Sequence, residues 1–162
     1  MLFWFAGLAV VIVWKVFGDP AIDYRLIMAG ALAPDLVDAM AGGLGVLHTV
    51  TASAVLLTVV MAATRGRRRL RRRLLAVPVG TFLHLVLDGA WTNAGLFWWP
   101  VLGTALPGDV PLSFHRPLVV LLAQEAAGVT ALVWWWRRFR LHEPERRQVF
   151  LRTGRLGRDL VA

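Results

Sequence analysis

The chain has 162 residues, a formal net charge of +8 and no cysteine. Hydrophobic residues make up 57% of it and the mean hydropathy is +0.61, whereas soluble domains are about 45 to 50% apolar. This composition argues against an ordinary soluble domain and predicts one polytopic membrane domain. The lack of cysteine excludes disulfides, thiolate zinc sites and a cysteine nucleophile, so His, Asp and Glu are the remaining strong metal ligands.

Two apolar segments begin the chain. Residues 1–17 predict a short helix that is retained, because no basic segment precedes it and no small-residue cleavage site follows it. Residues 23–41 are also helical in pattern but carry Pro34, Asp35 and Asp38 in their second half. This segment either spans the membrane or re-enters it, and neighbouring helices or an ion must cover its carboxylates.

The middle of the chain predicts a pair of membrane helices joined by arginines. Residues 46–64 carry no acidic or basic side chain except His48, which indicates a transmembrane helix. An arginine run follows at 65–73. A returning helix over 74–92 then places His84 and Asp88 inside an otherwise apolar segment.

The last part of the chain predicts a loop, a helix and a tail. The loop, residues 93–116, is rich in Gly and Pro, and the helix, residues 117–136, is interrupted by Gln124 and Glu125. The sequence therefore predicts an all-α membrane bundle of about five helices within residues 1–136. Residues 137–162 are expected to form a basic, partly disordered cytoplasmic tail.

Basic residues gather in two runs, 65–73 and the segment after Trp136. Such runs are typical of cytoplasmic loops beside membrane helices. Nucleic-acid binding is the competing interpretation. We rank it lower and expect no nucleic-acid partner, because both runs adjoin apolar segments where a topological signal is expected.

The polar residues within the apolar segments fall at similar depths. At about 1.5 Å rise per residue, Asp35 and His84 each lie roughly 15 Å from the cytoplasmic start of their helices, and Asp38 and Asp88 roughly 20 Å. Glu125 falls in the same layer by the same arithmetic. His48 begins its helix near the outer boundary and reaches the layer only if the preceding glycine turn dips inwards or the helix tilts.

Carboxylates and imidazoles at one depth form a ligand set for Zn, Mn, Fe or Mg. Each residue also has a simpler explanation. The His84 and Asp88 pair can be a hydrogen-bonded pair inside a bundle, and Glu125 can pair with an arginine. His115 and His142 fit surface positions. We favour a metal site for the combination, because such groups are costly in lipid.

Four motifs, GALAPDLVD, His48-Thr49, GTFLHLVLD and FWWP, follow one another within about residues 18–103. Their order resembles that of a bacterial family of inner-membrane-associated metal-dependent hydrolases. It implies a multi-pass protein of the bacterial cytoplasmic membrane with a divalent metal ion. The metal ligands that it implies are Asp35, Asp38, His48, His84 and Asp88.

Three departures from the family pattern are visible. The second motif has one histidine where the family has two, and PDLVD has one residue more between its aspartates than the common PDID form. A histidine usual near the N-terminus of the family is replaced by an apolar residue, which we align with Phe5. These departures predict fewer metal ions or a lost hydrolase activity.

The leading functional hypothesis is hydrolysis of a phosphoester or a lipid-derived ester by metal-activated water. Zn, Mn and Mg are the candidate metals, and Glu125 or Asp38 is the candidate general base. Covalent serine catalysis is disfavoured because neither Ser53 nor Ser113 lies in a nucleophile-elbow pattern or beside a histidine.

The alternative is a non-catalytic protein. It would be a membrane scaffold or an ion-handling protein whose buried Asp and His pairs hold helices together. Metal content separates this alternative from the hydrolase.

Overall fold

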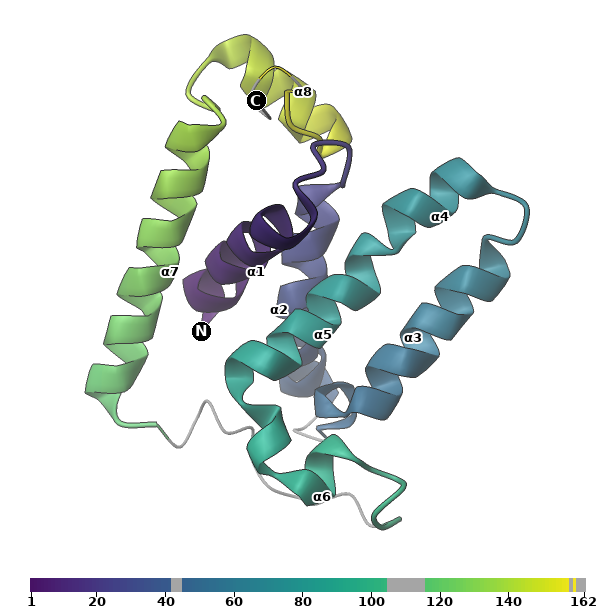
Figure 1. Ribbon diagram of the computed structural model, residues 1–162. Coiled ribbons are helices and arrows are strands. Elements are labelled where there is room, and N and C mark those ends of the chain that lie inside the picture. Colours follow the sequence, from purple (N-terminus) through teal and green to yellow (C-terminus); the bar gives the residue numbers. More distant parts are fainter. Residues whose placement is uncertain (42–44, 105–115, 158, 160–162) are drawn as a thin grey trace.

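The computed structural model describes residues 1–41, 45–104, 116–157 and 159, and all secondary structure within these ranges is helical (Figure 1). The long helices are α1 (Leu2–Phe17), α2 (Tyr24–Ala41), α3 (Val50–Ala63), α5 (Ala76–Asp88) and α7 (Leu118–Arg138). The short elements are η1 (Val46–His48), α4 (Arg68–Leu74), η2 (Ala90–Thr92), α6 (Ala94–Phe97) and α8 (Pro144–Thr153). The prediction of an all-α chain is therefore confirmed.

Helices α2 and α5 form the centre of the bundle. They make its most extensive helix contact, with α1 packed against α2 and α3 packed against α5 (Figure 1). Helix α7 lies on one side of the molecule and contacts α1, while α3 lies on the other side. Helices α4 and α8 lie at one end, and α6 lies at the opposite end.

Two helix crossings depend on glycine. A Cβ atom on Gly30 of α2 or on Gly80 of α5 would overlap the backbone of the facing helix, at Val77 and Ile27 respectively. Gly7 of α1 and Gly128 of α7 meet in the same way. Small residues at such positions let helix backbones touch, which is typical of packing in membrane proteins.

The helix boundaries differ from the predicted ones where a local cap intervenes. Residues 46–64 are not one helix, because Thr49 is extended (φ −104°, ψ 144°) and its side chain accepts a hydrogen bond from the Ala52 amide. This N-cap separates η1 from α3. Helix α5 ends at Asp88, since Gly89 adopts a left-handed conformation with φ 72°.

The segment expected to be a partly disordered tail contains α8. Phe150 of α8 and the following Leu156 are buried in the core, where Phe150 packs edge-on against Trp135 with ring centroids 5.4 Å apart. The Leu156 amide donates to Pro20 O, and Tyr24 N donates to Gly154 O. Apolar burial and backbone hydrogen bonds thus hold this segment against the turn between α1 and α2.

By length and composition, helix α7 is long and apolar enough to cross a membrane. Only 11% of its most apolar 18-residue stretch is buried within the molecule. Helices α1 and α3 are apolar but shorter. A core helix of a soluble protein would be mostly buried. The exposed apolar surface of α7 therefore needs a partner outside the described part of the chain.

The α2 and α5 crossing gives a first prediction. An exposed helical Gly→Ala change stabilises a protein by up to about 1 kcal/mol. Gly80→Ala should instead lower the free energy of unfolding by about 1–3 kcal/mol, because the new methyl group forces the two helices apart. Chemical unfolding in detergent measures the change. Gly95→Ala in α6, whose Cβ would meet Asn93 at an ordinary 3.6 Å, is the control, and stabilisation by Gly80→Ala would contradict the tight crossing.

An ionic cluster lies at the end of the bundle opposite α6 (Figure 1). Asp23, only 2% exposed, accepts hydrogen bonds from Arg25 at 3.0 and 3.1 Å and from Arg73 at 3.0 Å. Arg25 also donates to Leu151 O, so the cluster joins α2, α4 and α8. Burial alone would raise the pKa of Asp23, but the hydrogen bonds from the two arginines outweigh it and lower the pKa below 3.8.

The lowered pKa predicts a pH-dependent contribution of Asp23 to stability. A carboxyl group whose pKa falls on folding stabilises the native state above its unfolded pKa and loses this effect as pH falls through its folded pKa. At neutral pH, Asp23→Asn should lower the free energy of unfolding by about 1.5–3 kcal/mol. This difference between the variant and the wild type should close as the pH falls below about 4. Asp159→Asn, which removes an exposed ion pair with Arg146, is the control and should change little. A gap that persists in acid would show that Asp23 acts through packing.

Candidate metal centre

The candidate centre lies where α2, η1 and α5 meet. Asp35 and Asp38 lie three residues apart on α2 and share a face. His48 ends η1, and the Thr49 cap fixes it just before α3. His84 comes from the middle of α5. His48 and His84 are fully buried, whereas the Asp35 side chain is 23% exposed.

Three ligand atoms form a small triangle. Asp35 Oδ1 lies 3.5 Å from His48 Nε2 and 3.4 Å from His84 Nε2, and the two Nε2 atoms are 3.1 Å apart. Ligands about 2.0 to 2.1 Å from a tetrahedral zinc ion lie roughly 3.3 Å from one another. The triangle therefore has the size that one metal ion requires, and these three residues could hold it.

The helix contact orients His84. Its Nδ1 lies 2.7 Å from Ala31 O, and a carbonyl oxygen can only accept, so Nδ1 carries the proton. Pro34 has no amide hydrogen to donate to Gly30 O, one helical turn earlier. The Thr81 hydroxyl on α5 lies 3.3 Å from that freed carbonyl and 3.1 Å from Val77 O, so its one hydrogen is shared between the two. Both contacts cross the glycine-lined interface and direct His84 Nε2 away from α2's backbone into the centre.

Asp38 faces the other ring nitrogen of His48. Asp38 Oδ2 lies 2.8 Å from His48 Nδ1, although the angle is not that of an aligned hydrogen bond. A carboxylate at this position favours a proton on Nδ1 and leaves Nε2 unprotonated. Asp38 thus supports His48 from outside the triangle, in the way that outer carboxylates support metal-bound histidines.

With both imidazoles protonated on Nδ1, the triangle would hold three electron pairs and no proton. Two Nε2 lone pairs and a carboxylate oxygen converge, and Asp35 Oδ1 is buried without a hydrogen-bond partner. A hydrogen bond between the two Nε2 atoms would need one imidazole to move its Nδ1 proton or to become positively charged. A cation at the centre satisfies all three groups at once, so the residues present fit a divalent metal.

Phe5 of α1 closes one side of the centre. Its ring is buried and stacks on His84 with centroids 3.9 Å apart and an interplanar angle of 31°. Phe5, the residue that we align with a histidine of the resembled family, thus forms an apolar wall of the centre. The side toward Asp35 is more open, because Asp35 lines a pocket of about 330 Å³ together with Met1, Leu32 and Leu36.

Asp88 lies outside the ligand group. Both nitrogens of His84 face other elements, so the predicted sharing of one ion by His84 and Asp88 does not occur in this arrangement. Asp88 Oδ1 is buried 3.5 Å from Arg116 Nη2, and the same guanidinium donates to Asp88 O and to Gln124 Oε1. Arg116 therefore holds the end of α5 near α7.

Glu125, a predicted general base, contacts the start of α1. Its Oε2 accepts a hydrogen bond from the Phe3 amide at 2.9 Å, and its Oε1 lies 3.9 Å from the Met1 amino group. That amino group lies equally far from Asp35 Oδ2. Glu125 is thus occupied in capping a helix and lies outside the ligand group.

His142 is exposed after α7, and His115 and Ser113 lie outside the described residues.

Sequence reasoning missed the groups that hold the two imidazoles in place. Ala31 O and Thr81 give no motif of their own. Pro34 was a usable signal, because a proline inside a helix frees the carbonyl four residues earlier.

Comparisons with protein-family models, with curated proteins and with solved structures found no match for this chain.

The geometry predicts a graded series of metal affinities. Asp35→Asn and His84→Ala remove groups of the triangle and should abolish binding. Asp38→Asn keeps all three and should weaken affinity by about 10- to 100-fold. Metal content of the detergent-purified protein and titration with Zn²⁺, Mn²⁺ and Mg²⁺ measure the series. The exposed His142→Ala is the matched control, and wild-type protein that binds none of these ions would contradict the assignment.

Proposed function

We propose that this chain is a multi-pass membrane protein that binds a divalent metal ion and hydrolyses a phosphoester or lipid-derived ester. The observation that carries the proposal is the convergence of Asp35 Oδ1, His48 Nε2 and His84 Nε2, which lie within 3.5 Å of one another. Buried groups of this kind are unusual in apolar bundles and mark functional sites.

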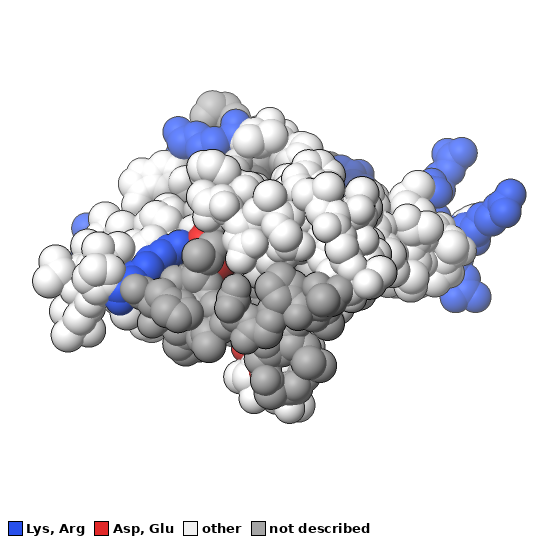
Figure 2. All heavy atoms as spheres, turned by 90° about the horizontal axis from the view of Figure 1, so that it is seen from below, with Lys and Arg blue, Asp and Glu red and all other residues white. Residues whose placement is uncertain are grey.

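The apolar exterior supports the membrane location. Large exposed hydrophobic side chains occur on α1, α2, α3, α5 and α7, with Met40 81% and Val119 76% exposed. Where the face at the α6 end is made of described residues, white uncharged residues cover most of it, with some blue basic atoms and small red acidic patches (Figure 2). Arginines of α4 and α8 lie at the opposite end, as expected for a cytoplasmic side. The centre would then lie in the outer half of the membrane.

The residues of the centre have separate roles in this proposal. Asp35, His48 and His84 hold the cation, and Asp38 and Ala31 O keep the imidazoles oriented. A bound divalent ion lowers the pKa of its water to about 7 and so supplies hydroxide without a side-chain nucleophile. The pocket beside Asp35 leaves that side of the centre open, and the Phe5 ring covers the other side.

The motif order supports the same function. The sequence resembles inner-membrane-associated metal-dependent hydrolases in GALAPDLVD, His48-Thr49 and GTFLHLVLD. Those motifs contribute the three residues of the triangle and the outer Asp38. The single histidine of the second motif fits one metal ion, because His48 supplies one imidazole from η1.

Hydrolysis by the metal-loaded protein tests the proposal. Phospholipids, isoprenoid phosphates and generic phosphodiesters are offered with Zn²⁺, Mn²⁺ or Mg²⁺. Turnover should rise with pH through about 7, stop with chelator and return when metal is added. His84→Ala should abolish turnover and His142→Ala should leave it unchanged.

Two outcomes would overturn the mechanism. Turnover that survives complete metal removal would exclude it. Stoichiometric metal without turnover on any substrate would favour the non-catalytic alternative, in which the buried Asp and His groups fix the register of the helices.

A further inference from the structure

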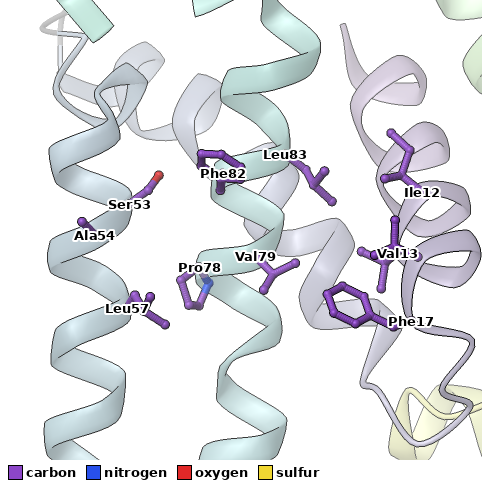
Figure 3. Close-up of a pocket in the computed structure, with 11 residues that line it drawn as sticks. Ile12, Val13, Phe17, Ser53, Ala54, Leu57, Pro78, Val79, Phe82 and Leu83 are labelled. Atoms are coloured by element: carbon purple, nitrogen blue, oxygen red, sulfur yellow. The ribbon is translucent and has the colours of Figure 1, made fainter. Parts of the chain in front are cut away.

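An apolar pocket lies between α1 and α3, over the face of α5 (Figure 3). Its volume is about 440 Å³, within the range of small-molecule sites and too small for a helix about 10 Å across. Carbon atoms of Val13, Leu57, Val79 and Phe82 form much of its wall. The pocket is open to the surroundings, because Leu57 is 43% and Phe82 45% exposed.

Ser53 places one hydroxyl in this apolar wall. It is 5% exposed, and its Oγ is buried without a hydrogen-bond partner. The helical Thr58, Thr130 and Thr153, by contrast, each donate to the carbonyl four residues earlier. The Ser53 hydroxyl is thus unsatisfied within the described structure, and a turn about χ1 would let it donate to a ligand oxygen in the pocket.

One end of the pocket is nearer to the candidate metal centre than the other, although Asp35, His48 and His84 do not line the pocket. Helix α3 starts just after His48, so Ser53 is nearer the centre than Leu57. Helix α5 runs toward His84, so Phe82 is nearer than Pro78. Figure 3 shows Ser53 and Phe82 at one level, and Leu57 and Pro78 at the other. The only hydroxyl of the lining therefore lies at the end that faces the centre.

We propose that this pocket binds one hydrocarbon chain of a membrane lipid, whose ester or phosphoester oxygen accepts a hydrogen bond from Ser53. The apolar wall matches the chain, and the single donor matches the junction between chain and head group. That junction would then lie beside Asp35, His48 and His84. The inference rests on the proposed function and deepens it, because it names a lipid as the substrate class.

Photolabelling in a bilayer tests the inference. The full chain is placed in nanodiscs that contain phosphatidylglycerol with a diazirine in one acyl chain, and labelled residues are mapped by mass spectrometry. Residues of the pocket, such as Ala54 and Pro78, should be labelled in excess of Val55, which is 55% exposed and lies outside the pocket lining. Equal labelling of both groups would overturn the inference.

Variants of α3 sharpen the result. Ala54→Phe fills the pocket and should remove the excess label on α5, whereas Val55→Phe adds bulk outside the pocket lining and should not. Ser53→Ala should weaken labelling by about fivefold, the effect of one lost hydrogen bond. Excess label that survives Ala54→Phe in folded protein would contradict the site, and the wild-type pattern decides the matter if that variant does not fold.

Measuring metal content together with labelling distinguishes a failure of the lipid site from a failure of the proposed function. Labelling is repeated on Asp35→Asn and on chelator-treated protein, where the pocket should still be labelled. A labelled pocket in protein that never binds metal would overturn the hydrolase alone. Bound metal with no preferential labelling would overturn the lipid site alone.

Discussion

The close contact between α2 and α5 is the constraint on which the candidate centre depends. Helices that interdigitate ordinary side chains lie about 8–10 Å apart. Gly30 and Gly80 remove the side chains at the crossing and bring the backbones into contact. Only then can His84 reach Ala31 O and Thr81 reach Gly30 O. The ring orientation of His84, and so the triangle of ligands, follows from this contact.

Proline and glycine act together at this interface. Pro34 leaves Gly30 O without its usual amide partner, and the hydroxyl of Thr81 replaces that partner from the neighbouring helix. A polar group freed in one helix is therefore satisfied by another, which is required where water is scarce. The same proline precedes Asp35, so the freed carbonyl and the candidate ligand carboxylate arise from one turn of α2.

Charge is distributed unequally along the bundle. The buried carboxylates and imidazoles lie between α2, η1 and α5, while the arginines of α4 and α8 lie at the other end with Asp19 and Asp23. The arginine end is thus held by full ion pairs. At the other end Asp35 faces the Met1 amino group at a longer 3.9 Å, and a divalent cation would satisfy all three groups of the triangle. The apolar pocket over α5 has its Ser53 end toward this centre (Figure 3).

The sequence by itself determined the helical class and the residues with the chemistry for a metal site. Apolar segments broken by glycine, proline and arginine can form little except helices, and buried Asp and His need partners. The tertiary structure decided which of them converge. A four-residue spacing placed His84 and Asp88 on one face of α5, but ring direction is set by the helix that α5 packs against. Asp88 therefore faces Arg116, Glu125 caps α1, and His48 enters the centre from a 3-10 turn. The pocket over α5 and the free hydroxyl of Ser53 likewise exist only because three helices separated in sequence meet there.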